Sequence, residues 1–378
     1  MIEIKNLHKS FKQTEVIKGI NLTIENGNIV SLIGPSGCGK TTTLRMINGL
    51  TQPTSGDILI DGKSVLKSDL IELRRNMGYV IQQTGLFPHM TIEENIEIIP
   101  TLSKIDKDKI KEKTRELMEM VNLPPDDYLW RYPSQLSGGQ LQRIGVARAF
   151  AMNPDIILMD EPFSALDPIT REQLQDEVLA IQDKFHKTVV FVTHDMNEAI
   201  KLSDKICIMN QGQVLQYDTP ENILKNPANE FVEGFVGSSR IWDNPEYIKA
   251  KDIMLTNPVK TYEGTTVIKD MDLMRQKKVD SIFVVTSDGT LKGIVPAKYI
   301  QNANDRSAPI KNYVYKPKVC VDINENIIEL LKKSNENKDS RMPVVDEQGK
   351  LVGLITKSSL VTTLSAQFID SEEVEDND

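Results

Sequence analysis

The sequence predicts an α/β protein: a mostly parallel sheet with helices on its faces, followed by a smaller duplicated α/β unit. Three observations predict it. Over residues 1–236, short apolar runs without alternation, typical of strands buried on both faces, recur between longer helical patterns. A charged helical pattern from Thr91 to Val121 indicates a helical insert, placed at about 86–150. Residues 251–360 repeat themselves once, at a spacing of roughly 60 residues.

Composition limits the class of protein further. The 378 residues, 39% apolar, suit two or three soluble domains. No stretch approaches the ~20 consecutive apolar residues of a membrane span, and the charged start lacks the apolar centre of a signal peptide. Three scattered cysteines fit a reducing compartment rather than a disulfide framework or zinc site. We therefore expect a cytoplasmic protein, unless a partner holds it at a membrane.

The charge is unevenly distributed. The net charge is −9, and six acidic residues lie within 370–378, so the folded body is close to neutral. Neither part offers the basic surface that nucleic acid requires, so no nucleic-acid partner is expected. The acidic tail, 370–378, is predicted to be a solvated, disordered end, with a regulatory arm as the alternative.

The main strands are predicted at Ile29–Ile33, Ile156–Met159 and Val189–Val192, each an uninterrupted or nearly uninterrupted apolar run. Helical segments such as Glu172–Lys184 lie between them. This βα alternation is typical of a parallel sheet covered by helices.

Each copy of the repeat reads as a helix, two strands joined by a glycine-containing turn, and a short helix. Val284-Val285 corresponds to Val344-Val345, and Gly289 corresponds to Gly349. After a linker at 237–247, we expect copies at 248–306 and 307–369 that pack together as one domain. A duplicated spacer is the plainest alternative.

A phosphate-binding loop follows the first of these strands. Its eight residues match the G-x-x-x-x-G-K-[ST] pattern and are Gly34, Pro35, Ser36, Gly37, Cys38, Gly39, Lys40 and Thr41. A helical run from Thr42 to Leu50 follows, so the loop lies between strand and helix as the motif requires. Its backbone N–H groups and helix N-terminus would surround phosphate oxygens, with Lys40 at the β- and γ-phosphates and Thr41 on Mg²⁺. A plain glycine-rich turn would not explain this context.

Two carboxylates end a second strand, at Asp160 and Glu161. Parallel strands deliver their carboxyl ends to the ligand crevice. Asp160 would hold Mg²⁺ directly or through water, and Glu161 would orient or deprotonate the attacking water. Acidic pairs also cap helices, but here the pair follows a phosphate loop.

Further motifs resemble those of ABC-type ATPases, which implies a P-loop nucleotide-binding domain with a helical subdomain. Leu136-Ser137-Gly138-Gly139-Gln140 precedes the carboxylate strand and resembles the family's signature motif, although locally it also reads as a serine-capped helix start. Gln82 follows a strand, Ser164-Ala165-Leu166-Asp167 follows the carboxylates, and Thr193-His194-Asp195 follows the next strand. Phe11 stands where the family places an adenine-stacking aromatic, with a core phenylalanine as the alternative.

The resemblance implies a homodimer that closes over two Mg-ATP molecules. Glu161, His194 and Gln82 would be catalytic. The phosphate loop with Thr42, Asp160 and Phe11 would bind ATP, and Thr41, Gln82 and Asp160 would hold Mg²⁺. The other copy would cover the same ATP with a separate set: Ser137, Gly138, Gly139, Gln140 and Asp167. A purely structural role for His194 is the alternative that its Thr-His-Asp context disfavours.

The whole chain except the tail resembles ATPase subunits of bacterial osmoprotectant importers, for glycine betaine, carnitine or choline. The stretches that carry this are Tyr79–Ile92, Asp167–Arg171 and Asn226–Val232. The repeat resembles the pair of CBS modules that such subunits often carry. The resemblance implies import, integral-membrane permease partners docking near Leu86–His89, an indirect substrate-binding protein, and a location on the cytoplasmic face of the cell membrane.

The CBS pair departs from the nucleotide-binding pattern of its family, which places a Ser or Thr and then an Asp that holds ribose. Those positions are Pro296 and Tyr299 in the first copy, and Thr356 and Ser359 in the second. The missing carboxylate disfavours AMP or ATP. A cyclic adenine dinucleotide at the module interface, ionic-strength sensing and dimerisation remain as alternatives.

Three other functions compete. A soluble ABC ATPase of DNA repair or translation needs basic surfaces or a second ATPase half, and a module without catalysis would not keep every catalytic position. An importer ATPase for another solute, such as an amino acid, stays open because solute specificity lies in other proteins.

Overall fold

The computed structural model describes residues 1–82, 85–164, 166–301, 303, 305–336 and 341–362. It contains two compact units, residues 1–237 and residues 238 onward. The predicted acidic tail at 370–378, the last seven residues of the second repeat copy, and Gln83, Thr84 and Ala165 of the quoted motifs lie outside the described residues.

A six-stranded sheet forms the centre of the first unit, in the order β10-β9-β3-β8-β7-β6. All neighbouring strands are parallel except the edge pair β9 and β10. The strands are β3 (Ile29–Ile33), β6 (Met77–Val80), β7 (Ile156–Asp160), β8 (Thr188–Thr193), β9 (Lys205–Asn210) and β10 (Gln213–Asp218). Strands β3, β7 and β8 are buried along their whole length, which explains their uninterrupted apolar sequence. The predicted α/β class with a mostly parallel sheet is confirmed.

A second, antiparallel sheet in this unit was not predicted. Its order is β2-β1-β4-β5, and its strands are β1 (Ile2–Phe11), β2 (Thr14–Ile24), β4 (Ser55–Ile60) and β5 (Lys63–Ser64). Apolar residues of β1 and β2 share one hydrophobic cluster with Val30 and Leu32 of β3, so this sheet packs on the strand that leads into the phosphate loop.

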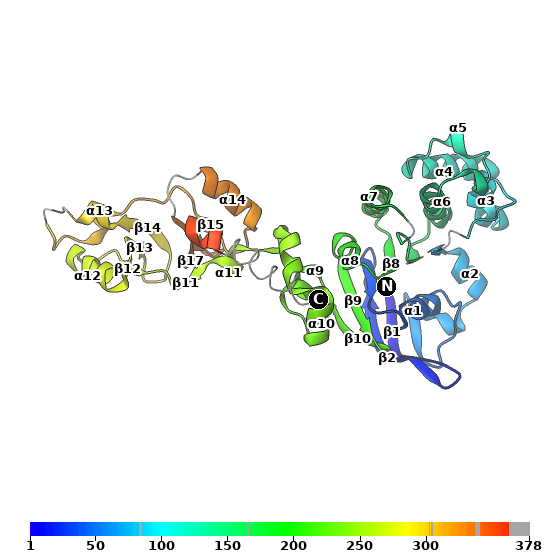
Figure 1. Ribbon diagram of the computed structural model, residues 1–378, viewed down its shortest axis with the longest axis horizontal. Helices are drawn as coiled ribbons and strands as arrows, with labels where there is room; N and C mark the ends of the chain where they lie inside the picture. Colours follow the sequence, from blue (N-terminus) through cyan, green and yellow to red (C-terminus); the bar gives the residue numbers. More distant parts are fainter. Residues whose placement is uncertain (83–84, 165, 302, 304, 337–340, 363–378) are drawn as a thin grey trace, which may run out of the picture. The chain divides into compact units, whose positions relative to one another are not determined.

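Helices cover the sheets, and four of them form the predicted insert. The helices of the first unit are α1 (Lys40–Ile47), α2 (Leu70–Arg75), α3 (Ile92–Leu102), α4 (Lys107–Met120), α5 (Pro125–Tyr128), α6 (Gly138–Phe150), α7 (Pro168–Phe185), α8 (Met196–Leu202), α9 (Pro220–Lys225) and α10 (Glu230–Val236), with short 3-10 turns at Val65–Lys67 and Pro133–Gln135. Figure 1 shows α3, α4, α5 and α6 gathered together. None of the helices in the described ranges is apolar and long enough for a bilayer span.

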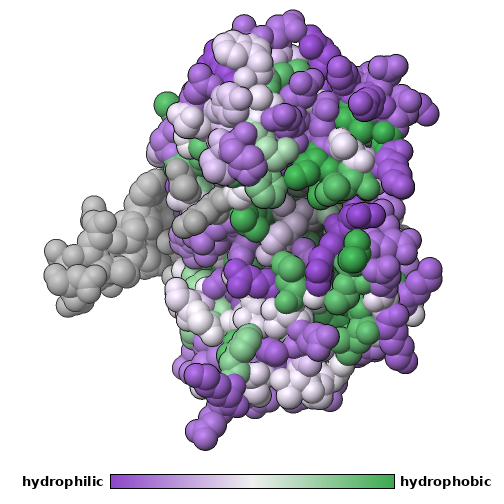
Figure 2. Space-filling view, turned by 90° about the vertical axis from the view of Figure 1, so that its right-hand side faces the viewer, coloured by the Kyte–Doolittle hydropathy of each residue, from purple (hydrophilic) through white to green (hydrophobic). Residues whose placement is uncertain are grey.

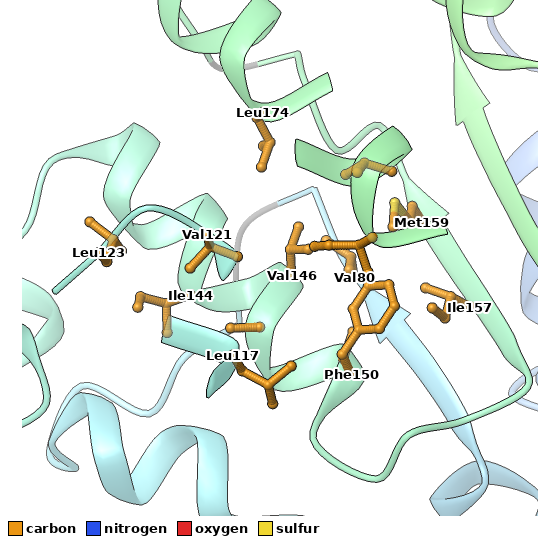
Figure 3. Packing of buried hydrophobic residues seen from close by; sticks show 14 of the residues in the cluster. Val80, Leu117, Val121, Leu123, Ile144, Val146, Phe150, Ile157, Met159 and Leu174 are labelled. Atoms are coloured by element: carbon orange, nitrogen blue, oxygen red, sulfur yellow. The ribbon is translucent and has the colours of Figure 1, made fainter. Parts of the chain in front are cut away.

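The insert and the sheet share one hydrophobic cluster. Figure 3 shows Val146 and Phe150 of α6 among sheet residues such as Val80 and Met159. Leu117 of α4 belongs to the same cluster, and all of these side chains are almost fully buried. Helix α6 therefore fixes the insert, and with it the turn that begins α6, against β6 and against β7, which ends at the two carboxylates.

The second unit contains the predicted repeat. Its strands are β11 (Leu255–Thr256), β12 (Lys260–Tyr262), β13 (Ser281–Val285), β14 (Leu291–Pro296), β15 (Val321–Asp322), β16 (Arg341–Val345) and β17 (Leu351–Thr356). Its helices are α11 (Ala250–Ile253), α12 (Val267–Lys277), α13 (Ala297–Ile300) and α14 (Ile327–Glu336), with a helical segment at 357–362 and 3-10 turns at Ser238–Asp243, Pro245–Tyr247 and Ile310–Tyr313.

The two repeat copies exchange strands and share a core. Strand β11, which precedes the first copy's other strands, pairs with β17 of the second copy. Correspondingly, Tyr315 bridges to Ile294 of β14. Phe283 and Leu351 belong to one cluster that joins the copies. The copies therefore contact each other as predicted.

Candidate active site

Four adjacent parallel strands bring the predicted catalytic groups to one edge of the central sheet. In the order β3, β8, β7, β6, they end at the phosphate loop, at His194, at Asp160 and Glu161, and just before Gln82. The pairings Ile33 with Thr193 and Asp160 with Val192 set these ends level with each other. Segments far apart in the sequence thus meet at one carboxyl edge, where ligands bind in open α/β sheets.

Glycine is required at both ends of the phosphate loop. A Cβ on Gly34 would lie 2.0 Å from the Met209 carbonyl oxygen, and a Cβ on Gly39 would lie 2.3 Å from Ile17 Cδ1. Gly37 has a positive φ of 79°, and no atom of the described residues lies within 4 Å of its Cβ position. The loop, residues 34–41, is thus a tight backbone turn that forms the candidate phosphate cradle.

Lys40 lies across this cradle. Its ammonium group donates to the carbonyl oxygens of Gly34 at 2.6 Å and Pro35 at 3.0 Å, and the residue is 8% exposed. Cys38 is buried beside it, and burial raises the pKa of the Cys38 thiol although Lys40 opposes the rise. The loop therefore holds one cation and a neutral thiol, a combination that suits a phosphate ligand.

Thr41 and Asp160 form an oxygen pair next to the cradle. The Thr41 hydroxyl donates to Asp160 Oδ1 at 2.8 Å. A hydroxyl oxygen and a carboxylate oxygen are ligands that Mg²⁺ prefers, and nucleotide phosphates commonly supply its remaining ligands. The residues present fit Mg²⁺ bound together with a nucleotide.

Glu161 is held from two sides. Gln82 Nε2 donates to Glu161 Oε2 at 2.9 Å, and His194 Nδ1 lies 3.7 Å from the same oxygen. The Glu161 N–H donates to the Val192 carbonyl oxygen at 3.1 Å, and its φ of 47° is left-handed, which is unusual for a residue other than glycine. The three predicted catalytic side chains therefore lie together.

The groups predicted to act on the other copy's ATP lie on the surface of the unit. Ser137 is the N-cap of α6 and forms a reciprocal capping box with Gln140. Ser137 and Gly138 are exposed, and the Cβ position of Gly139 faces Thr170 Cγ2 at 2.6 Å. Asp167 is also exposed and caps α7. This arrangement leaves the α6 turn and the start of α7 side by side and accessible to a second molecule.

Phe11 ends β1 with 49% of its surface exposed, so the alternative that it fills a core is wrong. Lys9 Nζ lies 4.7 Å from the centre of its ring. An exposed ring face is what stacking on a nucleobase requires.

Sequence reasoning did not single out two arginines that contact these segments. Arg148 of α6 donates to the Gly85 carbonyl oxygen at 2.7 Å, close to Gln82 in the chain. Arg171 donates to the Leu166 carbonyl oxygen at 3.1 Å, next to Asp167. Arg171 follows Asp167 by one helical turn, a weak signal in the sequence, whereas Arg148 has none.

Two family models match the chain. The model for ABC transporters matches residues 17–164, and the model for CBS domains matches residues 250–304 and 310–366. The two matches divide between the two compact units.

Relatives match over almost the whole length. The glycine betaine/carnitine/choline transport ATP-binding protein OpuCA of Bacillus subtilis is 46% identical over 376 residues, which cover 99% of this chain and 98% of the relative. The choline transport ATP-binding protein OpuBA of the same organism is 45% identical, over 96% of this chain and 95% of the relative. The osmoprotectant import ATP-binding protein OsmV of Salmonella typhimurium is 42% identical, over 97% of both chains.

Among solved structures, the dimeric structure of the bacterial ABC transporter cassette MJ0796 is 36% identical with a TM-score of 0.55, covering 58% of this chain and 99% of that one. The fold and the site define an ABC-type ATPase. The chain belongs to the family of ATP-binding subunits of ABC transporters, and its hydrolysis of ATP is coupled to transport.

Proposed function

We propose that this chain energises an importer of quaternary ammonium osmoprotectants such as glycine betaine, carnitine or choline. The support is the near full-length similarity to subunits whose names carry these solutes. Uptake of labelled glycine betaine, choline and carnitine by cells that produce the chain with its permease tests this proposal. Uptake of these solutes that is lost when Lys40 is replaced supports the proposal. Uptake of an amino acid and of none of these solutes would show that the importer carries a different solute.

The chain would act on the cytoplasmic face of the membrane as a homodimer attached to permease subunits, with a binding protein delivering the solute. Exposed apolar residues on the first unit support permease docking: Leu50, Leu66, Ile71 and Phe87. Figure 2 shows hydrophobic surface gathered within a mostly hydrophilic face of this unit. We place the ATPase domain at 1–236, the linker at 237–247 and the two CBS modules at 248–306 and 307–369.

The observation that carries the catalytic proposal is the contact of Glu161 with both Gln82 and His194. Glu161 would accept a proton from the attacking water, while Gln82 and His194 hold its carboxylate and His194 faces the γ-phosphate. Lys40 and the loop N–H groups would hold the β- and γ-phosphates. Thr41, Asp160 and Gln82 would hold Mg²⁺, which neutralises phosphate charge when bound.

The second half of each site would come from the partner copy. Ser137, Gly138, Gly139, Gln140 and Asp167 would cover the ATP held by the other chain, since a helix N-terminus and free N–H groups suit the γ-phosphate. ATP would then join the two copies, and hydrolysis would weaken the closed dimer.

Glu161→Gln tests this mechanism. We expect retained ATP binding, turnover lower by ~10²- to 10⁴-fold, and an ATP-bound dimer on size-exclusion chromatography. Glu172→Gln, on the exposed side of α7, removes a carboxylate outside the site and is the matched control. Normal hydrolysis by Glu161→Gln would remove Glu161 from the mechanism.

We further propose that the CBS pair regulates the ATPase by binding a cyclic adenine dinucleotide. Tyr299 stands at the ribose position of the first module, is 52% exposed, and packs edge-on against Tyr315. In the second module, Thr356 and Ser359 bond each other's backbone N–H groups at 2.9 Å. Neither position offers ribose a carboxylate, which disfavours AMP.

Calorimetry of the full chain with cyclic di-AMP, and with AMP as control, tests the ligand. Binding heat with cyclic di-AMP but not with AMP supports the proposal. No heat at saturating ligand rejects it, and a salt-dependent ATPase rate would then favour ionic-strength sensing over a dimerising role.

A further inference from the structure

Arg171 lies between the segment that carries Asp167 and the segment that carries His194. One guanidinium nitrogen, Nη2, donates to the Leu166 carbonyl oxygen at 3.1 Å, immediately before Asp167. Nη1 lies 3.9 Å from Asp195 Oδ2, and Nε lies 3.8 Å from Glu198 Oε1. The planar guanidinium therefore contacts three groups, one before Asp167 and two at the start of α8, with the fixed geometry that a flexible lysine ammonium lacks.

The Glu198 carboxylate and the Asp195 backbone both bond Thr193, the last residue of β8, and His194 follows directly. Glu198 accepts a hydrogen bond from the Thr193 hydroxyl. The same hydroxyl oxygen accepts the Asp195 N–H at 3.0 Å. The residues on both sides of His194 are thus bonded into one network.

Glu198, the acceptor in this network, is buried, with 6% of its surface exposed. Burial raises the pKa of Glu198 and the Asp195 charge adds to the rise, whereas the hydrogen bond from Thr193 and then the charges of Arg171 and His194 oppose it. Arg171 supplies positive charge to a carboxylate that is largely removed from water, so its position is tied to the position of that carboxylate.

The contacts of Arg171 differ in kind. The guanidinium donates a hydrogen bond to the Leu166 carbonyl oxygen, next to Asp167. Its contacts with Asp195 at 3.9 Å and Glu198 at 3.8 Å are ionic and too long for hydrogen bonds. A shift of the Asp167 segment therefore moves the guanidinium relative to Asp195 and Glu198.

We propose that Arg171 is a positioning residue that couples the two ATP sites of the dimer. The proposal rests on the functions proposed above for Asp167, which serves the partner's site, and for His194, which serves its own. When the partner's nucleotide engages Asp167, Arg171 transmits the displacement to the loop of His194 and thereby to Glu161.

Mixed dimers with a single active site test this coupling. One copy carries Glu161→Gln, so only the site built on the other copy's Glu161 turns over. Arg171→Gln is then placed either on the active copy, where it acts on His194, or on the inactive copy, where it acts through Asp167. We expect turnover to fall roughly 10-fold or more in both arrangements. ATP affinity should be unchanged, because the variant alters the positions of His194 and Asp167 and leaves the phosphate cradle intact.

Lys201→Gln is the matched control, since it removes an α8 to α7 ion pair, Lys201 to Asp176 at 2.8 Å, without touching either loop. It leaves turnover unchanged in both arrangements. A fall in only one arrangement, or in neither, would overturn the coupling. Arg171→Lys, which keeps the charge, is expected to restore the thermal unfolding temperature of Arg171→Gln but not turnover, which separates positioning from folding.

The Glu161→Gln homodimer reports separately on the proposed base. If it still hydrolyses ATP, the homodimeric Arg171→Gln protein tests the coupling through the Hill coefficient for ATP. A value near 1 against a higher value for the unaltered chain supports the coupling, and an unchanged value rejects it.

Discussion

Replacing Asp270 by leucine tests how much one buried carboxyl destabilises the first repeat copy. Asp270 lies on α12, is 1% exposed, and belongs to a helix packed on the cluster around Val267 and Ile282. Neither of its carboxyl oxygens makes a hydrogen bond of normal geometry within the described part of the chain. Thr261 of β12, 5% exposed, is its polar neighbour.

The second copy provides the matched design. The sequence offset that relates β13 to β16 makes Val321 the equivalent of Thr261 and Leu330 the equivalent of Asp270. Both of these apolar residues are 0% exposed. An unpartnered buried polar group costs ~1–3 kcal/mol, and a buried leucine contributes ~1.5–3 kcal/mol. Because the larger side chain costs ~1–3 kcal/mol where space is short, we expect Thr261→Val with Asp270→Leu to stabilise the unit by about 2 kcal/mol.

Hydrogen exchange of peptides from α12 and β13 measures this in the full chain, since it reports local opening. A gain of about 2 kcal/mol slows exchange roughly 30-fold. Peptides from α14 and β16 are the internal control. Faster exchange in α12 of the double variant would refute the reasoning, because it would mean that the Asp270 carboxyl stabilises the fold.

The pH dependence gives a second readout of the same group. Burial raises the pKa of Asp270, so the folded unit keeps a proton that the unfolded chain releases near its ordinary ~3.9. Stability therefore falls as pH rises from about 4 to the raised pKa and is constant above it. The advantage of Asp270→Leu should thus be larger at pH 8 than at pH 4, and an equal advantage at both would contradict the assignment.

Two further predictions concern the first unit. Gly139→Ala forces Thr170 to move and should lower the free energy of unfolding by ~1–3 kcal/mol in urea. Gly138→Ala places its Cβ more than 4 Å from every described neighbour and should raise that free energy by ~0.4–1 kcal/mol; equal effects would contradict the geometry. Arg143→Met leaves Glu177 buried without the cation that lies 2.9 Å away, so we expect the free energy of unfolding to fall by ~3–5 kcal/mol in thermal unfolding. Adding Glu177→Leu should recover most of this loss, and a double variant as unstable as the single one would contradict the reasoning.

The strands of the central sheet could be predicted because a strand buried on both faces consists of consecutive apolar residues. The antiparallel sheet could not. Strand β1 pairs with β2 through register shifts between Ile4 and Leu7 and again near Ser10, and these interrupt the alternation that would have revealed it. Strands β11, β12 and β15 have two or three residues each, too few for any pattern.

The sequence could predict that the candidate site residues share one edge of the sheet, but not how they contact one another. Gln82, Glu161 and His194 each follow a strand, so parallel topology places them at one edge. Their contacts depend on strand order, and the left-handed backbone of Glu161 has no sequence signal. Arg171 contacts carboxylates that are distant in sequence, and a helix-surface arginine is otherwise unremarkable.

The division of the catalytic groups explains where regulation can act. The left-handed φ of Glu161 costs ~1–3 kcal/mol and persists because Val192 accepts its N–H, Ser164 donates to its carbonyl oxygen, and Gln82 holds its carboxylate. The groups within one chain are therefore positioned before any nucleotide binds. On the proposed functions, Ser137 and Asp167 instead lie exposed, so the site is completed only when two chains close. Closure is then the step that a regulatory unit can control, and a bias of ~1–3 kcal/mol on the dimer changes the population of complete sites by roughly 5- to 150-fold.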